Sequence, residues 1–174
     1  MKKRGFEVVS TYEKEGIQLP VRATKHAAGY DFEAAVDLVI PSIWRAGLLP
    51  VLKGLVQKDE AATIAKKVKP TLVPTGVKAY MREDEYLQLC NRSSNPLKRF
   101  LVLTNGVGVI DSDYYNNPDN EGQIYFQFTN FGPVDVTIKK GERIGQGIFL
   151  PFLKADQDSS GGERTGGFGS SGQG

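Results

Sequence analysis

Short apolar segments separated by turn residues make up most of this chain. Apolar, aromatic and β-branched residues gather in runs of three to eight, a composition typical of β-strands. The runs are 6–9, 71–73, 100–103, 122–129, 134–138 and 147–150. Eight of the nine prolines fall between these runs, where proline does not interrupt strand pairing. The pattern predicts an all-β fold, either an antiparallel sandwich or a jelly roll.

The run over 122–129 has the clearest alternation. Three apolar residues alternate there with three more polar ones, namely Ile124, Phe126 and Phe128 with Tyr125, Gln127 and Thr129. Successive side chains of a strand point to opposite faces. This segment is therefore predicted to be a half-buried strand.

Residues 42–68 break the strand pattern. Several leucines fall near one face of a helix, and residues 59–67 have high helix propensity. Pro50 and Gly54 interrupt the segment, which favours a helical hairpin or a kinked helix. One alternative is an insert that packs on the sheet. The other is a surface that binds a partner protein, because Trp44 and its neighbours are many apolar groups for a peripheral element.

Length and charge limit the classes of function. At 174 residues the chain is expected to form one domain, and its net charge of +2 gives no basic footprint for direct nucleic-acid binding. No apolar run reaches the ~18 residues of a membrane span, and residues 1–4 do not begin a signal peptide.

Cysteine and histidine each occur only once in the sequence. Cys90 cannot form an intramolecular disulfide and suits a cytoplasmic location, and we expect it to be a small core residue. His26 lies in a polar stretch and is expected on the surface. A Cys-His or Ser-His nucleophile and a histidine-based metal site are disfavoured by this composition.

Two acidic residues end a hydrophobic segment at 105–114. If the strand continues, Asp111 and Asp113 point to the same face and both reach one pocket. A carboxylate there suits a general base that activates water. The alternative is an Asx-type turn.

Two other segments carry groups that bind phosphate. Arg92, Ser93 and Ser94 offer a guanidinium and two hydroxyls, although the same residues suit the start of a helix. The glycine-rich tail over 163–174 carries Arg164 and Phe168, an arrangement that suits a lid over a nucleotide; the alternative is a solvated tail. Residues 139–146 indicate by themselves only a charged turn between strands.

Taken together and in order, five segments resemble the five motifs of the trimeric dUTP diphosphatase (dUTPase) family. They are 28–32, 92–94, 108–114, 141–146 and 164–172. The resemblance implies a jelly-roll or distorted β-barrel subunit of the dUTPase-like β-clip type over residues 1–160, with a helical insert at about 42–68. It also implies a homotrimer with shared active sites, and a C-terminal arm over 161–174 that closes over the site of another subunit.

The implied reaction is hydrolysis of dUTP to dUMP and pyrophosphate, which keeps uracil out of DNA and supplies dUMP for dTMP synthesis. By resemblance, Asp111 deprotonates the water that attacks the α-phosphorus. Mg²⁺ bridges the phosphates and is held mainly by the substrate, with Asp31 in contact only through water.

The resemblance also implies which residues bind dUTP. Arg92, Ser93, Ser94 and Gln146 hold phosphates, and Arg164 takes the terminal phosphate. Uracil is read by Asn105 and the backbone of Gly108, Val109 and Ile110, while Tyr114 packs under the deoxyribose and blocks a 2′-hydroxyl. The arm stacks Phe168 on uracil and adds Gly169 and Ser170 to the binding residues.

The chain departs from the family pattern at four places. A longer loop, 115–122, follows Tyr114, and Gly145 replaces the usual alanine. One residue fewer separates Arg164 from Phe168, and typical members lack the insert. The alternatives to a plain dUTPase are an enzyme similar to dCTP deaminase, and a dUTPase with an added regulatory role in which the insert binds a protein.

Overall fold

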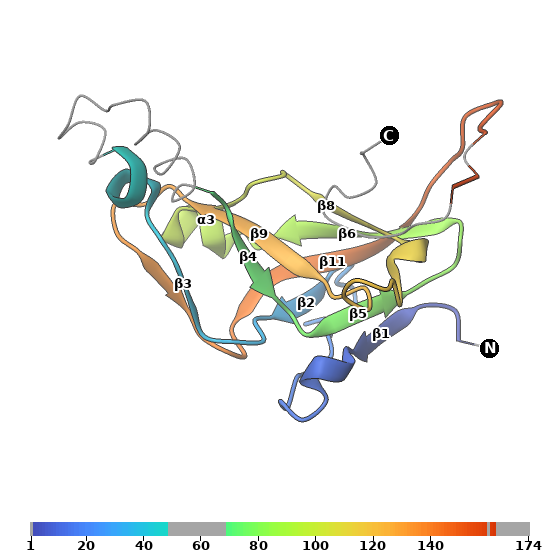
Figure 1. The fold of residues 1–174 in the computed structure, drawn as a ribbon, viewed down its shortest axis with the longest axis horizontal. Coiled ribbons are helices and arrows are strands. Elements are labelled where there is room, and N and C mark those ends of the chain that lie inside the picture. The colour runs from blue at the N-terminus through green and yellow to red at the C-terminus, as the bar shows by residue number, and fades with distance from the viewer. Residues whose placement is uncertain (1, 49–68, 160, 163–174) are drawn as a thin grey trace.

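Strands dominate the fold, as the ribbon in Figure 1 shows. The computed structural model describes residues 2–48, 69–159, 161 and 162. The strands are β1 (Gly5–Val8), β2 (Tyr30–Glu33), β3 (Leu38–Ile40), β4 (Thr71–Pro74), β5 (Val77–Tyr80), β6 (Glu85–Asn91), β7 (Leu101–Leu103), β8 (Gly108–Asp111), β9 (Tyr125–Asn130), β10 (Val136–Ile138) and β11 (Arg143–Pro151). The helical elements in the same residues are η1 (Ser10–Tyr12), η2 (Trp44–Leu48), α3 (Ser94–Arg99) and η3 (Ser112–Tyr114).

Two sheets enclose the hydrophobic core. A four-stranded sheet has the order β2-β11-β6-β8, and a three-stranded sheet has the order β4-β9-β7. Their facing sides are apolar: Phe32 of β2 and Phe126 of β9 are fully buried, with ring centroids 5.6 Å apart. Two further sheets, β1-β5 and β10-β3, have two strands each. The prediction of an all-β fold is therefore confirmed.

Each of the six predicted runs contains a strand, and the alternation of β9 is confirmed. Its residues 126, 128 and 130 are buried, while 125, 127 and 129 are half-buried. The strands β2, β3, β5 and β6 were not predicted. The first three have only three or four residues and gain their stability from distant partner strands, and the seven-residue β6 mixes two leucines with polar residues.

The insert begins with a turn that is hydrogen-bonded to the loop after β9. The hydroxyl of Ser42 donates to the carbonyl oxygen of Gly132 at 2.6 Å, and the indole Nε1 of Trp44 donates to the carbonyl oxygen of Phe131 at 2.9 Å. A single π-helical turn, η2, follows. The remainder of the predicted helical segment, 49–68, lies outside the described residues. Figure 1 places η2 and β1 at opposite ends of the molecule.

The single histidine and the single cysteine differ in how well their predicted burial is met. His26 is exposed, as predicted. Cys90 is only half-buried, and its sulfur accepts a hydrogen bond from Gln88 at 3.4 Å, so the prediction of a core position is wrong. The reason is the period of β6, whose residues 86, 88 and 90 point away from the core while Leu87 and Leu89 point into it.

Candidate active site

Asp31 is the centre of a polar cluster formed by three of the five motif segments. Its side chain is only 5% exposed. It accepts a hydrogen bond from Gln146 Nε2 at 3.1 Å and pairs with Arg143 Nη1 at 3.3 Å. Arg92 Nε lies 3.8 Å from the same carboxylate. The structure thus brings together Asp31 of β2, Gln146 of β11 and Arg92, which lies between β6 and α3.

The short helix α3 fixes this cluster to the sheet. Asn95 is buried, and its Nδ2 donates to the side chain of Asn91 and to the carbonyl oxygen of Ile144, each at 2.8 Å. Arg92 donates to the carbonyl oxygen of Arg143 at 3.1 Å. The helix begins at Ser94, and Ser93 in the N-cap position makes no side-chain capping bond. A helix therefore does begin here. Ser93 and Ser94 directly follow Arg92 of the cluster in the sequence.

Gly29 allows Gln146 to lie against the first motif. A β-carbon added to Gly29 would lie 3.1–3.2 Å from three side-chain atoms of Gln146. That spacing is tighter than ordinary van der Waals contact, so a larger residue would displace the amide that bonds to Asp31. Residues 139–146 are more than the charged turn that their local sequence indicates, because Gln146 lies within β11.

A pocket of about 170 Å³ lies beside β8. Its lining includes all six of the predicted residues between 105 and 114, together with three others: Asn105, Gly108, Val109, Ile110, Asp111 and Tyr114, with Leu89, Tyr125 and Gln127. Gly108 is required by close packing, since an added β-carbon would lie 3.0 Å from Leu89 Cβ. The pocket thus combines an apolar floor with a few polar groups, as small-molecule sites commonly do.

Only one of the two candidate carboxylates borders this pocket. Asp111 is the last residue of β8 and is half-buried, whereas Asp113 is exposed and is absent from the lining. The strand ends at Asp111 and the 3-10 turn η3 follows, so the period of two no longer applies. The expectation that both carboxylates reach one pocket is therefore wrong.

Asp111 and the Asp31 cluster lie at opposite ends of β6. Asp111 is opposite Tyr86, at the start of that strand, whereas Arg92 follows its last residue. Six residues at about 3.3 Å each separate Tyr86 from Arg92 along the strand, a distance of about 20 Å. An aspartate and an arginine that far apart do not reach the same phosphate group within one chain.

Known proteins resemble the chain along most of its length. The dUTPase family model matches residues 55–172. A deoxyuridine 5'-triphosphate nucleotidohydrolase from Lactococcus lactis is 50% identical over 174 residues, which cover 99% of both chains. The chain belongs to the dUTPase family of enzymes.

The solved structures agree with this family. The crystal structure of a dUTPase from Streptococcus mutans is 45% identical, covers 87% of this chain and 98% of its own, and has a TM-score of 0.70. A dUTPase from phage phi11 of S. aureus is 16% identical with a TM-score of 0.63 over 91% of this chain and 97% of its own, which shows the fold alone. These likenesses confirm the predicted dUTPase-like β subunit.

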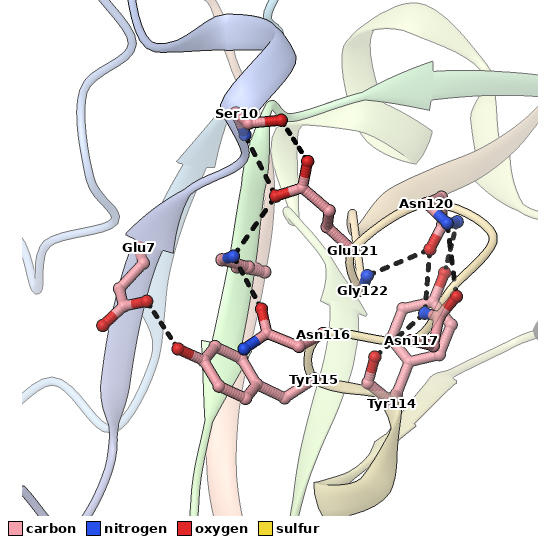
Figure 2. Close-up of polar contacts among 10 residues, drawn as sticks. Glu7, Ser10, Tyr114, Tyr115, Asn116, Asn117, Asn120, Glu121 and Gly122 are labelled. Carbon is pink, nitrogen blue, oxygen red and sulfur yellow. Dashed lines mark hydrogen bonds and ion pairs between the residues drawn. The ribbon is translucent and has the colours of Figure 1, made fainter.

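The loop in which this chain departs from the usual dUTPase pattern is built into the fold (Figure 2). Its Glu121 accepts hydrogen bonds from the backbone and side chain of Ser10 and pairs with Lys78 at 3.3 Å. Tyr115 donates to Glu7 at 2.6 Å, which lowers the pKa of Glu7 and raises that of Tyr115. These contacts anchor the end of the third motif on β1 and β5.

Sequence reasoning missed two groups of site residues. Arg143 lies within the fourth motif but was not singled out, although it pairs with Asp31. Tyr125 and Gln127 line the pocket from the polar face of β9. The alternation along β9 contained that signal, because it marks these side chains as facing away from the core. Arg164, Phe168, Gly169 and Ser170 lie outside the described residues.

Metal binding by protein groups alone has no support in the described part of the chain, where no three His, Cys, Asp or Glu side chains group to hold an ion. Asp31 already contacts two guanidinium groups and an amide. A metal ion bound directly to Asp31 would compete with these contacts. The donor set therefore fits Mg²⁺ held mainly by substrate phosphates, with Asp31 beyond its first coordination shell.

Proposed function

We propose that this chain hydrolyses dUTP to dUMP and pyrophosphate. The observation that carries the proposal is the nucleobase-scale pocket of about 170 Å³ with Asp111 on its edge, in a member of the dUTPase family. A pocket that places a carboxylate beside the bound nucleotide suits water activation at the adjacent phosphate.

In the proposed mechanism, Asp111 accepts a proton from a water molecule while the oxygen of that water attacks the α-phosphorus. The bond between the α-phosphorus and the oxygen bridging to the β-phosphorus breaks, and pyrophosphate leaves. Arg92, Ser93, Ser94 and Gln146 hold the phosphates. When bound, Mg²⁺ neutralises phosphate charge and fixes the triphosphate for in-line attack.

Selectivity for uracil and deoxyribose is assigned to the pocket lining. Asn105 and the backbone of 108–110 would present donors and acceptors to the uracil edge, and this closely fitting wall would leave no room for a 5-methyl group. Tyr114, 5% exposed and part of the pocket wall, supports the sugar and excludes a 2′-hydroxyl. Such exclusion gives high selectivity when the wall is rigid.

We assign the complete site to more than one copy of the chain, in a homotrimer. The separation of about 20 Å between Asp111 and Arg92 along β6 supports this assignment. Asp111 and Gln146 both lie on the outward face of the four-stranded sheet, because Asp111 pairs with Tyr86 and Gln146 pairs with Cys90. Val109 on that face is 56% exposed, an apolar surface that a second copy would cover.

We assign the lid to the C-terminal arm that follows the single β domain. Residues 151–159 are all exposed, and Figure 1 shows this segment leaving the sheets after β11. Arg164 would then hold the terminal phosphate and Phe168 would stack on uracil, while Gly169 and Ser170 approach the nucleotide. Closure of such an arm excludes bulk water from the reaction.

Three further predictions concern protein binding through the insert, the location of the protein and the metal ion. Protein binding through the insert depends largely on 49–68, which lie outside the described residues. Among the described residues no helix is long and apolar enough to cross a membrane, and the cytoplasmic location stays a prediction. The Mg²⁺ requirement gains support from the phi11 phage dUTPase, which is described with a structural Mg(II) ion.

The test is pyrophosphate release from dUTP with Mg²⁺, measured beside dCTP, dTTP and UTP. Release from dUTP alone is expected. Ammonia release from dCTP would instead favour the deaminase, and no release from any of the four would contradict the proposed hydrolysis. Removal of Mg²⁺ with EDTA should suppress the reaction, and added Mg²⁺ should restore it.

A further inference from the structure

Tyr114 is held at both of its ends by asparagines from the loop over 115–122 (Figure 2). Asn117 Nδ2 donates to the backbone carbonyl oxygen of Tyr114 at 2.9 Å. Asn120 Nδ2 donates to the Tyr114 hydroxyl at 2.9 Å, and that hydroxyl donates to the carbonyl oxygen of Gln123 at 3.0 Å. Because the hydroxyl has a donor partner and an acceptor partner, the ring is fixed in one orientation.

The two asparagines are also bonded to each other. Asn117 Nδ2 donates to Asn120 Oδ1 at 2.9 Å, and the backbone N–H of Gly122 donates to the same oxygen at 3.0 Å. Asn117 Oδ1 accepts the backbone N–H groups of Asp119 and Asn120 at 3.0 and 3.2 Å. Asn117 is only 5% exposed, and hydrogen bonds shielded from water in such a network are strong.

The loop cannot move freely as a unit, because Asn116 and Glu121 are bonded to residues outside it. Lys78 of β5 donates to Asn116 Oδ1 at 2.7 Å and pairs with Glu121, which also binds Ser10. None of these side chains lines the pocket. The asparagine pair therefore connects a fixed part of the fold to the ring that lines the pocket.

We propose that Asn120 is a positioning residue for the choice of deoxyribose over ribose, acting through the hydroxyl of Tyr114. The inference rests on the proposed function, in which Tyr114 excludes the 2′-hydroxyl. A tyrosine in the pocket wall excludes the 2′-hydroxyl of ribose only when its ring does not move aside. The hydrogen bond from Asn120 is a side-chain contact at the hydroxyl end of the ring, so its loss lets the ring move and admits ribose.

The test compares kcat/KM for dUTP and UTP in the full chain and in Asn120→Ala. We expect the preference for dUTP over UTP to fall about tenfold, the effect of one lost hydrogen bond on selectivity. Tyr115→Phe is the matched control, because it removes one side-chain hydrogen bond from the same loop on the side away from the pocket. It should leave the preference unchanged.

A double-mutant cycle separates positioning from general loosening of the loop. In a Tyr114→Phe background, Asn120→Ala should cause no further change in the dUTP/UTP preference, because the hydroxyl through which it acts is absent. If Asn120→Ala does not fold, Tyr114→Phe removes the bond from Asn120 together with the bond to the Gln123 carbonyl oxygen while keeping the ring, and should itself lower the preference.

Several results would overturn the inference. These are an unchanged preference in Asn120→Ala or in Tyr114→Phe, an equal fall in Tyr115→Phe, and additive effects in the double variant. A wild-type chain that does not hydrolyse dUTP would overturn the proposed function itself, so the two failures are distinguishable.

Discussion

The ring of Phe126 occupies the space that a side chain at Gly145 would need. A β-carbon added to Gly145 would lie 2.5 Å from Cδ1 and Cζ of Phe126 and nearer still to Cε1. Phe126 is fully buried between the two sheets and cannot withdraw. The glycine in the fourth motif, where the family usually has alanine, is therefore matched to this aromatic core.

Gly145→Ala should destabilise the protein by about 2 kcal/mol, the usual cost of overpacking a filled core. The measurement is urea unfolding at a fixed protein concentration. Phe126→Leu in the same chain should remove part of that penalty, because the smaller side chain vacates the space. Gly161→Ala is the control, since a β-carbon there meets nothing within 4 Å. Equal effects at the two glycines would contradict the packing argument.

Asp111→Asn should lower kcat for dUTP by about 10²–10⁴-fold, the range for loss of a general base. Binding of a non-hydrolysable imido analogue of dUTP, measured by calorimetry, should persist because the amide keeps the shape of the carboxylate. Asp113→Asn is the matched control: Asp113 is exposed and does not line the pocket. Its kcat should stay within about twofold of the wild type. A similar loss in both variants would argue against Asp111 as the base.

Mixed oligomers of two inactive variants should regain activity. Asp111→Asn and Arg92→Ala each damage one half of the proposed shared site. After subunit exchange, sites that take Asp111 from one copy and Arg92 from another are intact, which gives about one quarter of the wild-type rate in an equal mixture. If all groups of a site came from one chain, every site would keep one defect and the mixture would show no gain.

The contact between Tyr115 and Glu7 should make stability depend on pH. The hydrogen bond from Tyr115 holds the pKa of Glu7 below its ordinary value of 4.5 in the folded protein. A depressed carboxyl pKa stabilises the fold above that value, and the contribution is lost as the pH falls through the folded pKa. The bond to Glu7 also raises the pKa of Tyr115 above 10.0, so the tyrosine contribution is present below pH 10 and is lost as the pH rises.

Melting temperatures of the wild type and Tyr115→Phe, measured from pH 3 to pH 7, provide the check. The difference between the two proteins should be largest above pH 4.5 and should shrink as Glu7 becomes protonated. A difference that stays constant over this range would show that the contact between Tyr115 and Glu7 contributes nothing to the pH dependence.

Local sequence patterns predicted β9, whose faces differ in polarity, but missed β6, which alternates in the same way. The alternation over 122–129 fixed both the strand and its buried face, since side-chain period follows directly from strand geometry. The same rule failed for Asp113, because the strand ends at Asp111 and a 3-10 turn begins. Strand ends depend on contacts with distant segments, which a local pattern does not contain.

The motifs predicted which residues meet around Asp31, but not where Asp111 lies relative to them. The motif order placed Asp31, Arg92 and Gln146 in one family site, and the pairing of β2 with β11 explains why they meet. Nothing in the spacing of Arg92 and Asp111 indicates that β6 separates them. Nor does the loop 115–122 reveal its role from sequence, because its partners Glu7, Ser10 and Lys78 come from the first half of the chain.

The attachment of this loop to β1 joins the beginning of the chain to the wall of the nucleotide pocket. Neither Glu7 nor Ser10 lines the pocket, and both contact the side of the loop opposite to the asparagine pair. Natural variation at the N-terminus of such enzymes should therefore change how firmly the third motif is held in the fold, and so the stability of the enzyme, while the choice of sugar stays with Asn120 and Tyr114.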